Sequence, residues 1–276
     1  MERLRRTDVG ATTSTDGEPG SRSNSRPDHV NGHAVGKEPC GPLGDGYRLA
    51  PLRLDYNPLV VNERYLRLYS GVVYDACEHL GLSGRAMSGG MYPLVHTMKV
   101  AGPAFTVHCI STPSRDERIH NIRLGMLRSM TPGCVQIRDT QGNCNCGQFG
   151  EISATAARAA GCVGAVIDGS TRDSNRLIEM EFPTFCRFRN PVEAFGRFMA
   201  VDYQVPICVQ GIDGQLVVYP GDYLFGDNDG VVIVPKAKTM AVLKQAEEWF
   251  ESEARSRADM ASGIDPFEVY EKHGRF

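Results

Sequence analysis

Lysine is scarce in this chain, tryptophan occurs once, and no long apolar run is present. Only six of the 30 basic residues are lysines. Catalysis through a Schiff base needs a desolvated lysine, and only Lys99 precedes a plausible buried strand. No segment reaches the ~18 consecutive apolar residues of a membrane-spanning helix. The sequence therefore argues against Schiff-base chemistry and against a membrane span.

An excess of positive charge is also missing. The formal net charge is −3, whereas a protein that works mainly on nucleic acid or on an anionic membrane carries a basic surface. Arg3, Arg5 and Arg6 stand near the N-terminus, but no apolar segment follows them, so we expect no secretory signal. We predict neither a nucleic-acid partner nor a membrane partner.

Cysteine pairs at zinc spacing are the third absence. The nine cysteines are odd in number and mostly stand inside apolar runs, which is typical of buried free thiols in a reducing cytoplasm. Cys144 and Cys146 form a C-x-C pair, but no second pair or histidine stands at zinc spacing. We therefore expect a cytoplasmic location and no structural zinc.

Apolar residues are sparse over the first 45 positions. Ser, Thr, Gly, Asp, Asn, Pro and Arg dominate there, and such a composition cannot bury enough surface to offset the entropy of ordering. We predict a disordered tail over residues 1–45 and a single domain over residues 46–276. Hydrophobic residues make up 41% of the whole chain, which is enough for a sizeable core.

The first half of this domain alternates between helix and strand patterns. A helical pattern begins near Val61, and Gly81 is a plausible stop. Strands are predicted at 104–110, 134–137 and 163–167, with a helix before the second and the alanine-rich helix 151–160 before the third. This alternation favours an α/β layered core.

The second half is richer in strands. Short apolar segments separated by turn residues occupy 184–186, 205–209, 216–219, 223–225 and 231–234. A helix from about 236 to 262 follows, and we interpret residues 263–276 as a tail. The expected fold is a single α/β domain with a β-rich second half and a long C-terminal helix.

Polar residues follow the buried strand 163–167, where open α/β folds hold ligands. In the segment from Asp168 to Asp173, the guanidinium of Arg172 could steady an oxyanion, and Asp173 could ligate a hard cation. A loop salt bridge, with Asp173 capping the next helix, explains the same residues equally well.

Two further motifs carry weaker signals. Gly150 and Glu151 open a helix whose free N–H groups could bind a substrate carboxylate, although Glu151 is also an ordinary first-turn residue. The acidic segment 220–230 lacks the spacing of a calcium-binding EF-hand, and its Asp-Gly pair indicates a hairpin turn. We interpret that segment as structural.

Taken in order, these segments resemble one protein family. They are Ala101–Val107, Gly150-Glu151 before the alanine-rich helix, Gly164–Asp173, Phe182–Phe185, Val205–Ile207, Pro220–Asp222 and Asp227–Pro235. As an ordered set they are similar to the RraA-like / 4-hydroxy-4-methyl-2-oxoglutarate (HMG) aldolase family, over about residues 65–265. The first 45 residues lie outside the resemblance.

The resemblance implies a swivelling β/β/α-type fold that assembles as a homotrimer or homohexamer with sites between subunits. In the aldolase branch a divalent cation, usually Mg²⁺ and alternatively Mn²⁺, holds a small 2-oxo acid. Asp173 then looks like the metal ligand and Arg172 the residue on the 2-oxo oxygen. An acidic residue late in the chain, either Glu251 or Glu253, would enter a neighbour's site. The backbone clamp on the substrate carboxylate would come from Gly150, Glu151, Ile152 and Ser153.

The function implied is that of a class II, metal-dependent carbon–carbon lyase. Cleavage beta to a ketone leaves a pyruvate enolate, so one site could serve HMG aldolase chemistry and oxaloacetate decarboxylation. Cys144, Cys146 and the pair Arg138-Asp139 depart from the family's usual pattern, which leaves a pathway-specific lyase with an unusual substrate open. The alternative from another class is a non-catalytic RraA-like regulatory protein. The long C-terminal segment 247–276 resembles the aldolase branch instead.

Overall fold

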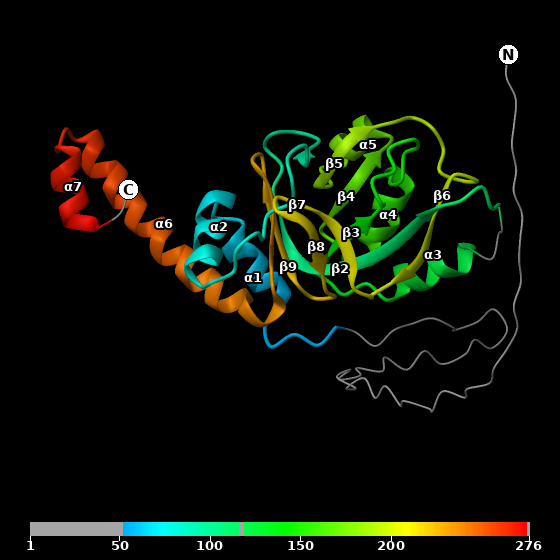
Figure 1. Ribbon diagram of the computed structural model, residues 1–276, viewed down its shortest axis with the longest axis horizontal. Helices are drawn as coiled ribbons and strands as arrows, with labels where there is room; N and C mark the ends of the chain where they lie inside the picture. Colours follow the sequence, from blue (N-terminus) through cyan, green and yellow to red (C-terminus); the bar gives the residue numbers. More distant parts are fainter. Residues whose placement is uncertain (1–51, 116–118, 275–276) are drawn as a thin grey trace, which may run out of the picture. The chain divides into compact units, whose positions relative to one another are not determined.

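The computed structural model describes residues 52–115 and 119–274 (Figure 1). The predicted disordered tail over 1–45 therefore lies outside the described residues. Among those described, no helix combines the length and the apolar character that crossing a bilayer requires.

Four parallel strands form the middle of the main sheet. Successive strands are joined by the helices α3 (Ile119–Arg128), α4 (Glu151–Ala159) and α5 (Ser174–Glu179). Because each crossover places the next strand beside the last, the carboxyl ends of these strands meet at one edge of the sheet. In spatial order the strands are β5 (Thr184–Arg189), β4 (Gly164–Thr171), β3 (Val135–Asp139) and β2 (Val100–Ser111).

The long strand β2 joins the two halves of the sheet. Its first residues pair antiparallel with β9 (Tyr223–Asp227), which continues to β10 (Gly230–Val234). Its last residues pair antiparallel with β6 (Phe198–Tyr203), after a register shift between His108 and Cys109. The short strand β1 (Tyr92–Pro93) closes the other edge on β5, and β7 (Ile207–Gly211) forms a separate two-stranded sheet with β8 (Gly214–Val218).

The core lies on both faces of this sheet. Helices α3, α4 and α5 cover one face around Phe105, Val107 and Ile167, which are fully or almost fully buried. The β7–β8 hairpin covers the other face with Val209 and Val218. The continuous apolar run in β4 is buried over its whole length, as a strand covered on both faces requires. The prediction of a single α/β domain with a β-rich second half is thus confirmed.

The helical pattern predicted from Val61 is broken in the structure. It forms two helices, α1 (Pro58–Tyr65) and α2 (Ser70–His79). The ammonium group of Lys99 donates hydrogen bonds to the carbonyls of Leu66 and Leu68 in the break, over 3.4 and 2.6 Å. These bonds satisfy carbonyls that a continuous helix would have paired internally.

The long C-terminal helix is confirmed as α6 (Thr239–Ala261), which follows the 3₁₀ turn η1 (Lys236–Lys238). Its stripe of Val242, Leu243 and Ala246 is fully buried in a cluster with residues of α1 and α2. Figure 1 shows α6 continuing past α2 toward the C-terminal end of the chain.

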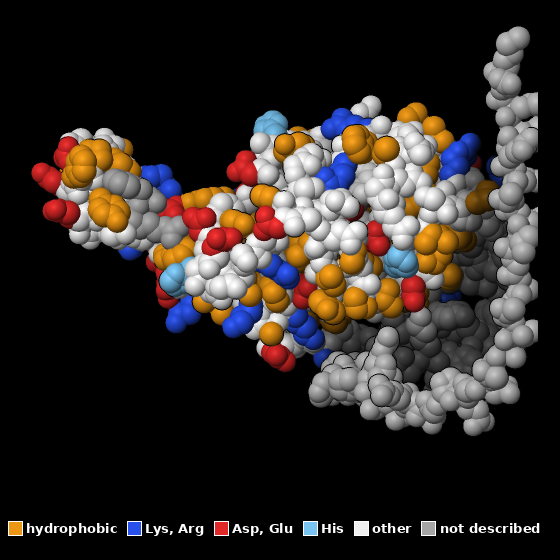
Figure 2. All heavy atoms as spheres, viewed as in Figure 1, with side chains coloured by type: hydrophobic (Ala, Val, Ile, Leu, Met, Phe, Trp, Pro, Cys, Tyr) orange, Lys and Arg blue, Asp and Glu red, His pale blue; other side chains and the backbone are white. Residues whose placement is uncertain are grey.

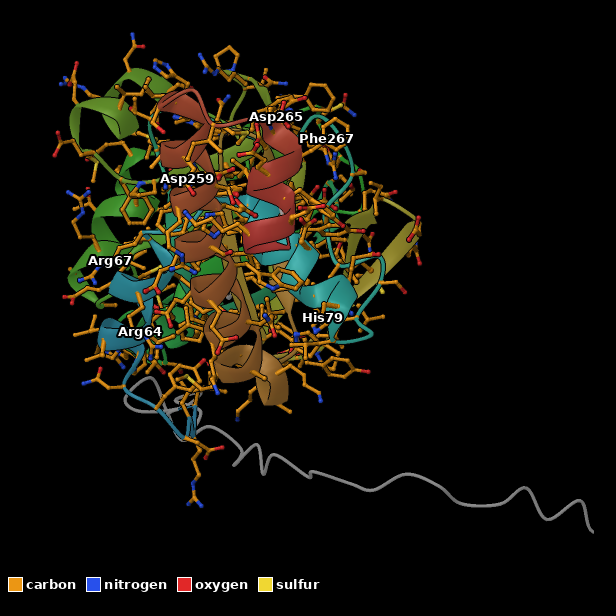
Figure 3. The ribbon with its side chains drawn as sticks, turned by 90° about the vertical axis from the view of Figure 1, so that its left-hand side faces the viewer. Arg64, Arg67, His79, Asp259, Asp265 and Phe267 are labelled. Carbon is orange, nitrogen blue, oxygen red and sulfur yellow. The ribbon has the colours of Figure 1, made fainter. Side chains whose placement is uncertain are left out.

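The segment expected as a tail after α6 contains one further helix, α7 (Pro266–His273). The carboxylate of Asp265 accepts a hydrogen bond from the backbone N–H of Phe267, and Pro266 stands at the first helical position. Both are start signals that the sequence already carried. Lys272 and His273 then contact the Asp259 carboxylate of α6, over 2.8 and 2.7 Å. Figure 3 shows Asp259 on α6 and Asp265 and Phe267 at the start of α7.

Candidate functional site

A cavity of about 330 Å³ lies beside the carboxyl ends of β3 and β4. It brings together five of the residues that the sequence predicted, namely Gly150, Ile152, Ser153, Arg172 and Asp173. The cavity wall also contains residues that the sequence did not single out. They are Arg123 and Met126 of α3, Glu193 to Gly196 of the connection between β5 and β6, and Met199 of β6. No local sequence pattern identifies these lining residues. Several of them reach the cavity only because the connection 190–197 and strand β6, which the sequence did not predict, pack beside it.

The predicted clamp and the predicted Arg–Asp pair lie directly against each other. The backbone N–H of Arg172 donates to the carbonyl of Phe149 over 2.8 Å, and the Thr171 hydroxyl donates to the same carbonyl. This pairing holds residues 147–150 alongside the end of β4, so the first turn of α4 faces Arg172 and Asp173.

Glycine at position 150 makes this close approach possible. A Cβ atom there would stand 2.5 Å from Oδ2 of Asp173 and 2.9 Å from Cγ of Arg172. The backbone of Gly150 is extended, with φ −153°, so its conformation alone would admit any residue. The missing side chain leaves room for the carboxylate.

The Asp173 carboxylate bridges the two parts of the site. Its Oδ1 lies 3.4 Å from Nε of Arg172, and its Oδ2 accepts from the backbone N–H of Glu151 over 3.2 Å. Asp173 stands at the N-cap position of α5 in a left-handed conformation, with φ 58°, yet its side chain makes no capping bond to that helix. The carboxylate therefore makes the predicted salt bridge with Arg172 and also contacts the backbone of Glu151 at the start of α4.

Both side chains of this pair keep access to solvent. Arg172 and Asp173 each have 36% of the side-chain surface exposed. The first turn of α4 beside them has N–H groups at positions 152 and 153 without partners inside the helix, as every helix start does. The guanidinium and these N–H groups are two kinds of donor for a small anion in the cavity, and the Asp173 carboxylate lies beside them as a potential cation ligand.

Arg138 forms part of the cavity wall from inside the fold. It is 7% exposed, its guanidinium lies 5.2 Å from the centre of the Phe149 ring, and burial lowers its pKa. Arg138, which departs from the usual pattern of the family, thus lines the cavity. Its neighbour Asp139 instead accepts from the backbone N–H of Gln141 and contacts His108 over 3.0 Å.

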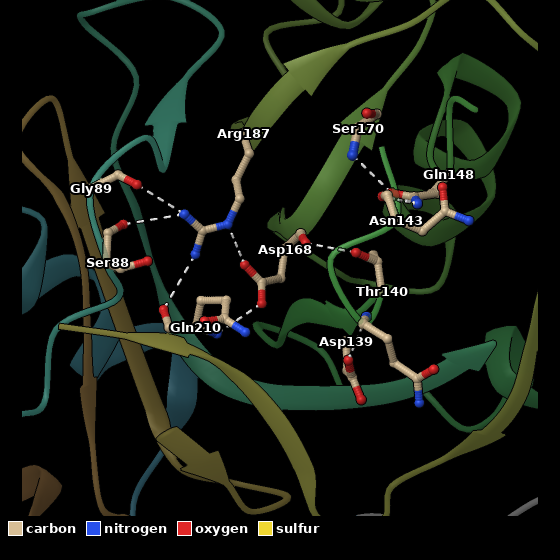
Figure 4. A network of polar contacts seen from close by, with 11 residues as sticks. Ser88, Gly89, Asp139, Thr140, Asn143, Gln148, Asp168, Ser170, Arg187 and Gln210 are labelled. Atoms are coloured by element: carbon tan, nitrogen blue, oxygen red, sulfur yellow. Dashed lines mark hydrogen bonds and ion pairs between the residues drawn. The ribbon is translucent and has the colours of Figure 1, made fainter. Parts of the chain in front are cut away.

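Asp168, in the same motif as Arg172, belongs to a separate network (Figure 4). Its Oδ1 lies 2.5 Å from Nε of Arg187, and its Oδ2 accepts from the backbone N–H of Gln210. The guanidinium of Arg187 also donates to the carbonyl of Gly89 over 2.9 Å. Burial raises the pKa of Asp168. This buried pair ties β4 and β5 to β7, and it does not line the cavity.

Neither C-terminal glutamate lies with Arg172 and Asp173 in this chain. Glu253 is 6% exposed on α6, where its carboxylate accepts from the hydroxyl of Tyr69 and lies 3.4 Å from Nη1 of Arg257. Glu251 is exposed on the same helix. Their role in a neighbouring subunit stays a prediction.

The acidic segment 220–230 is structural, as interpreted from the sequence. Asp222 accepts from the backbone N–H groups of Tyr219 and Lys236, and burial raises its pKa. Asp227 accepts from the backbone N–H groups of Ser70 and Asp229. These aspartates secure the β8–β9 and β9–β10 turns and the start of α2.

The two cysteines of the C-x-C pair differ in position. Cys144 is exposed and Cys146 is buried, and both are free thiols. The carbonyl of Cys144 accepts from the side chains of Ser170 and Asn190. The loop is therefore attached to the end of β4 through the backbone.

The donor set suits a water-rich cation better than a cation enclosed by protein. No group of three or more His, Cys, Asp or Glu side chains that could hold a metal occurs among the described residues. Mg²⁺ commonly keeps several waters and takes one or two carboxylates from the protein. The half-exposed Asp173 carboxylate, with the space that Gly150 leaves beside it, fits that mode.

Comparison with known proteins identifies the class. The RraA-like family model, described as Aldolase/RraA, matches residues 71–233, and the chain belongs to this family. A Halalkalibacterium halodurans protein named "Putative 4-hydroxy-4-methyl-2-oxoglutarate aldolase" is 32% identical over 170 residues, which cover 60% of this chain and 74% of that protein. The Legionella pneumophila protein DlpA is 24% identical over 201 residues, 73% of this chain, but the match spans only 32% of its own length.

A solved structure shows the same fold. Streptomyces coelicolor RraAS2, described as an unusual member of the RNase ES inhibitor RraA protein family, superposes with a TM-score of 0.62 at 26% identity. The match covers 75% of this chain and 99% of that one. Relatives thus carry names from both an aldolase and a regulatory branch.

Proposed function

We propose that the protein is a divalent-metal-dependent lyase that cleaves a carbon–carbon bond of a small 2-oxo acid. The observation that carries this proposal is the placement of Arg172 and Asp173 against the first turn of α4 within one cavity. A regulator that binds through its surface has no need of a cavity with this combination of groups.

The backbone N–H groups at the start of α4 would bind the carboxylate of the 2-oxo acid. They are oriented along the helix axis, and the partial positive charge of a helix N-terminus favours an anion there. Ile152, which is 75% exposed, leaves this end of the helix open to a ligand. The ligand's ketone oxygen would then lie on the side of Arg172.

Arg172 would stabilise the charge that develops during bond cleavage. In oxaloacetate, the bond from C3 to the departing carboxylate breaks, its electron pair forms the C2–C3 double bond, and negative charge moves to the C2 oxygen. Carbon dioxide leaves, and a proton added at C3 gives pyruvate. The permanently charged guanidinium can donate to the C2 oxygen before and after that shift.

Asp173 would hold the cation through its carboxylate. When bound, a divalent cation supplies Lewis-acid polarisation of the ketone. The cation remains a proposal, and Mg²⁺ or Mn²⁺ suits an oxygen donor set of this kind.

The scarcity of lysine agrees with this chemistry. No lysine is among the residues that line the cavity within the described part of the chain. Lys99, the single candidate from the sequence, uses its ammonium group on the carbonyls of the α1–α2 break. An enolate stabilised by charge therefore accounts for the site better than a Schiff base does.

Pyruvate release from oxaloacetate tests the proposal. We expect release that requires Mg²⁺ or Mn²⁺, and we expect Asp173→Asn to abolish it while the thermal unfolding midpoint stays unchanged, because this carboxylate is half-exposed. HMG would be assayed in the same way. Absence of release from either substrate with every divalent cation tried would overturn the lyase and favour the regulatory branch.

We further propose that the active form is a homo-oligomer in which a C-terminal glutamate enters a neighbour's site. Apolar side chains are exposed beside the cavity and on the last helix: Leu124 is 53%, Ile152 75% and Phe267 82% exposed. Figure 2 shows apolar side chains gathered on the surface of α7. Burial of such groups against another copy would be favourable.

Complementation between inactive variants tests the shared site. Asp173→Asn chains are mixed with Glu251→Gln or Glu253→Gln chains and allowed to exchange subunits. Partial recovery of activity supports a site built from two subunits. The exposed Glu251 is the more available of the two, since Glu253 already has Tyr69 and Arg257 as partners. Full activity of both glutamine variants, or an active monomer, would refute this arrangement.

A further inference from the structure

The guanidinium of Arg138 is held by two hydrogen bonds that leave part of it unused. Its Nε donates to the side-chain oxygen of Gln136 over 2.8 Å, and its Nη1 donates to the carbonyl of Gln148 over 2.6 Å. Its Nη2 has no hydrogen-bond partner among the described residues. Because Arg138 lines the cavity while it is only 7% exposed, this nitrogen belongs to a positive charge fixed in the cavity wall.

This charge has no counterion in the described part of the chain. No carboxylate there pairs with Arg138, whose pKa is lowered by burial and further by the nearby charge of Arg123. Buried charges are ordinarily paired, because loss of hydration without a counterion is costly. Two described carboxylates line the cavity, and neither pairs with Arg138. Asp173 contacts Arg172 and the backbone of Glu151, and Glu193 is exposed.

Arg123 adds a second guanidinium to the same place. It is exposed on α3, and its side chain has no hydrogen-bond partner among the residues that the structure describes. It lines both the main cavity and an adjoining hollow of about 360 Å³. Arg138, Met126, Ile152 and Ser153 line both spaces as well. The two arginines therefore stand where the main cavity continues beyond the first turn of α4.

We propose that Arg138, together with Arg123, forms a second anion subsite that binds a carboxylate remote from the 2-oxo acid group of the substrate. This inference rests on the proposed function, in which the start of α4 and Arg172 take the 2-oxo acid end. The ligand class is then a 2-oxo acid with a further carboxylate. The segment 147–150 runs beside both Arg172 and Arg138: a Cβ atom on Gly147 would stand 2.6 Å from Cβ of Arg172, and the carbonyl of Gln148 accepts from Arg138.

The subsite would act mainly in discrimination. A 2-oxo acid that ends in a methyl group leaves the buried guanidinium unpaired, and a site built around a polar group rejects such an analogue strongly. A charge-assisted hydrogen bond of this kind corresponds to a preference of about tenfold or more in Kd. In the aldol cleavage of HMG the distal carboxylate is not the reacting group, so for such a substrate the effect falls on binding more than on the rate constant. In oxaloacetate the same carboxylate is the departing group, and the binding preference is therefore tested with substrates that do not react there.

Calorimetric titration with two matched probes tests the subsite. 2-Oxoglutarate and 2-oxopentanoate differ only in a terminal carboxylate against a methyl group, and both are titrated in the presence of Mg²⁺. The proteins are the wild type, Arg138→Met, Arg138→Lys and Arg123→Gln. Arg67→Gln is the matched control, because Arg67 is exposed on the α1–α2 break, away from the cavity.

We expect the wild type and Arg67→Gln to prefer 2-oxoglutarate by about tenfold or more. Arg138→Met should lose this preference while its Kd for 2-oxopentanoate stays within about twofold, and Arg138→Lys should keep part of it. Arg123→Gln should reduce the preference for 2-oxoglutarate. If Arg138→Met does not fold, this reduction is the result that supports the subsite, and an unchanged preference in Arg123→Gln refutes it. An unchanged preference in the folded variants, or equal binding of both probes by the wild type, would refute the subsite alone. Failure of the wild type to bind either probe would refute the 2-oxo acid site as well.

Discussion

The missing side chain at position 150 gives a sensitive test of the proposed site. In Gly150→Ala, the new methyl group would stand 2.5 Å from Oδ2 of Asp173, so the carboxylate must retreat by about 0.9 Å to reach the 3.4 Å at which ordinary contact begins. Displacement of a reacting or binding group by ~1 Å can cost about 10²-fold in rate. We expect kcat/KM for pyruvate release to fall by that order.

Stability should respond far less than activity. The side chains of Asp173 and Arg172, which the new methyl group would approach to 2.5 and 2.9 Å, are each 36% exposed and can move toward solvent, and the extended backbone of Gly150 accepts alanine. A change of less than about 1 kcal/mol in the free energy of unfolding is therefore expected, as for other substitutions outside the core. Gly89→Ala is the matched control, because a Cβ there meets nothing within 4 Å.

A double variant separates displacement of Asp173 from other effects. Because Asp173→Asn is expected to abolish turnover, the double variant is compared by its Kd for Mg²⁺. If Gly150→Ala acts by moving the carboxylate, it should raise this Kd in the wild-type background and should not raise it further in the Asp173→Asn background. Wild-type kcat/KM in a folded Gly150→Ala protein would show that the position of this carboxylate does not matter to turnover, and the assignment of Asp173 would fail.

Three further predictions concern the wider structure. Arg172→Lys should lower kcat by about 10²-fold, the scale of one lost oxyanion donor, whereas a raised KM at unchanged kcat would mean uniform binding instead. Asp168→Ala should cost about 3 kcal/mol or more in urea denaturation by leaving Arg187 buried and unpaired, and a loss below 1 kcal/mol would contradict this. Lys272 and, less strongly, His273 lower the pKa of Asp259, so its stabilisation of α7 is present above the ordinary aspartate pKa and is lost as pH falls through the lowered one. Asp259→Asn should accordingly speed amide exchange in α7 at neutral pH, and unchanged exchange would refute the contact.

The sequence alone determined the elements whose signals are local. The apolar run 163–167 could only be a buried strand, and the polar residues after it marked the edge where ligands bind. The glycine before the alanine-rich helix likewise located the start of α4. The break between α1 and α2 could not be foreseen, because it depends on a hydrogen bond from Lys99, some thirty residues away.

Only the tertiary structure decided which polar residues share the cavity. Asp168 and Arg172 stand four positions apart, and alternation along a regular strand would place them on the same face. A register shift between Ile167 and Ser170 and the end of β4 at Thr171 separate them, so that Asp168 contacts Arg187 and Arg172 lines the cavity. Arg123 and Arg138 reach one cavity wall from α3 and β3 because the crossover packs the helix on the sheet. The charge of Arg138 was visible in the sequence, but that no counterion stands beside it among the described residues is a property of the packing around it, which no local pattern records.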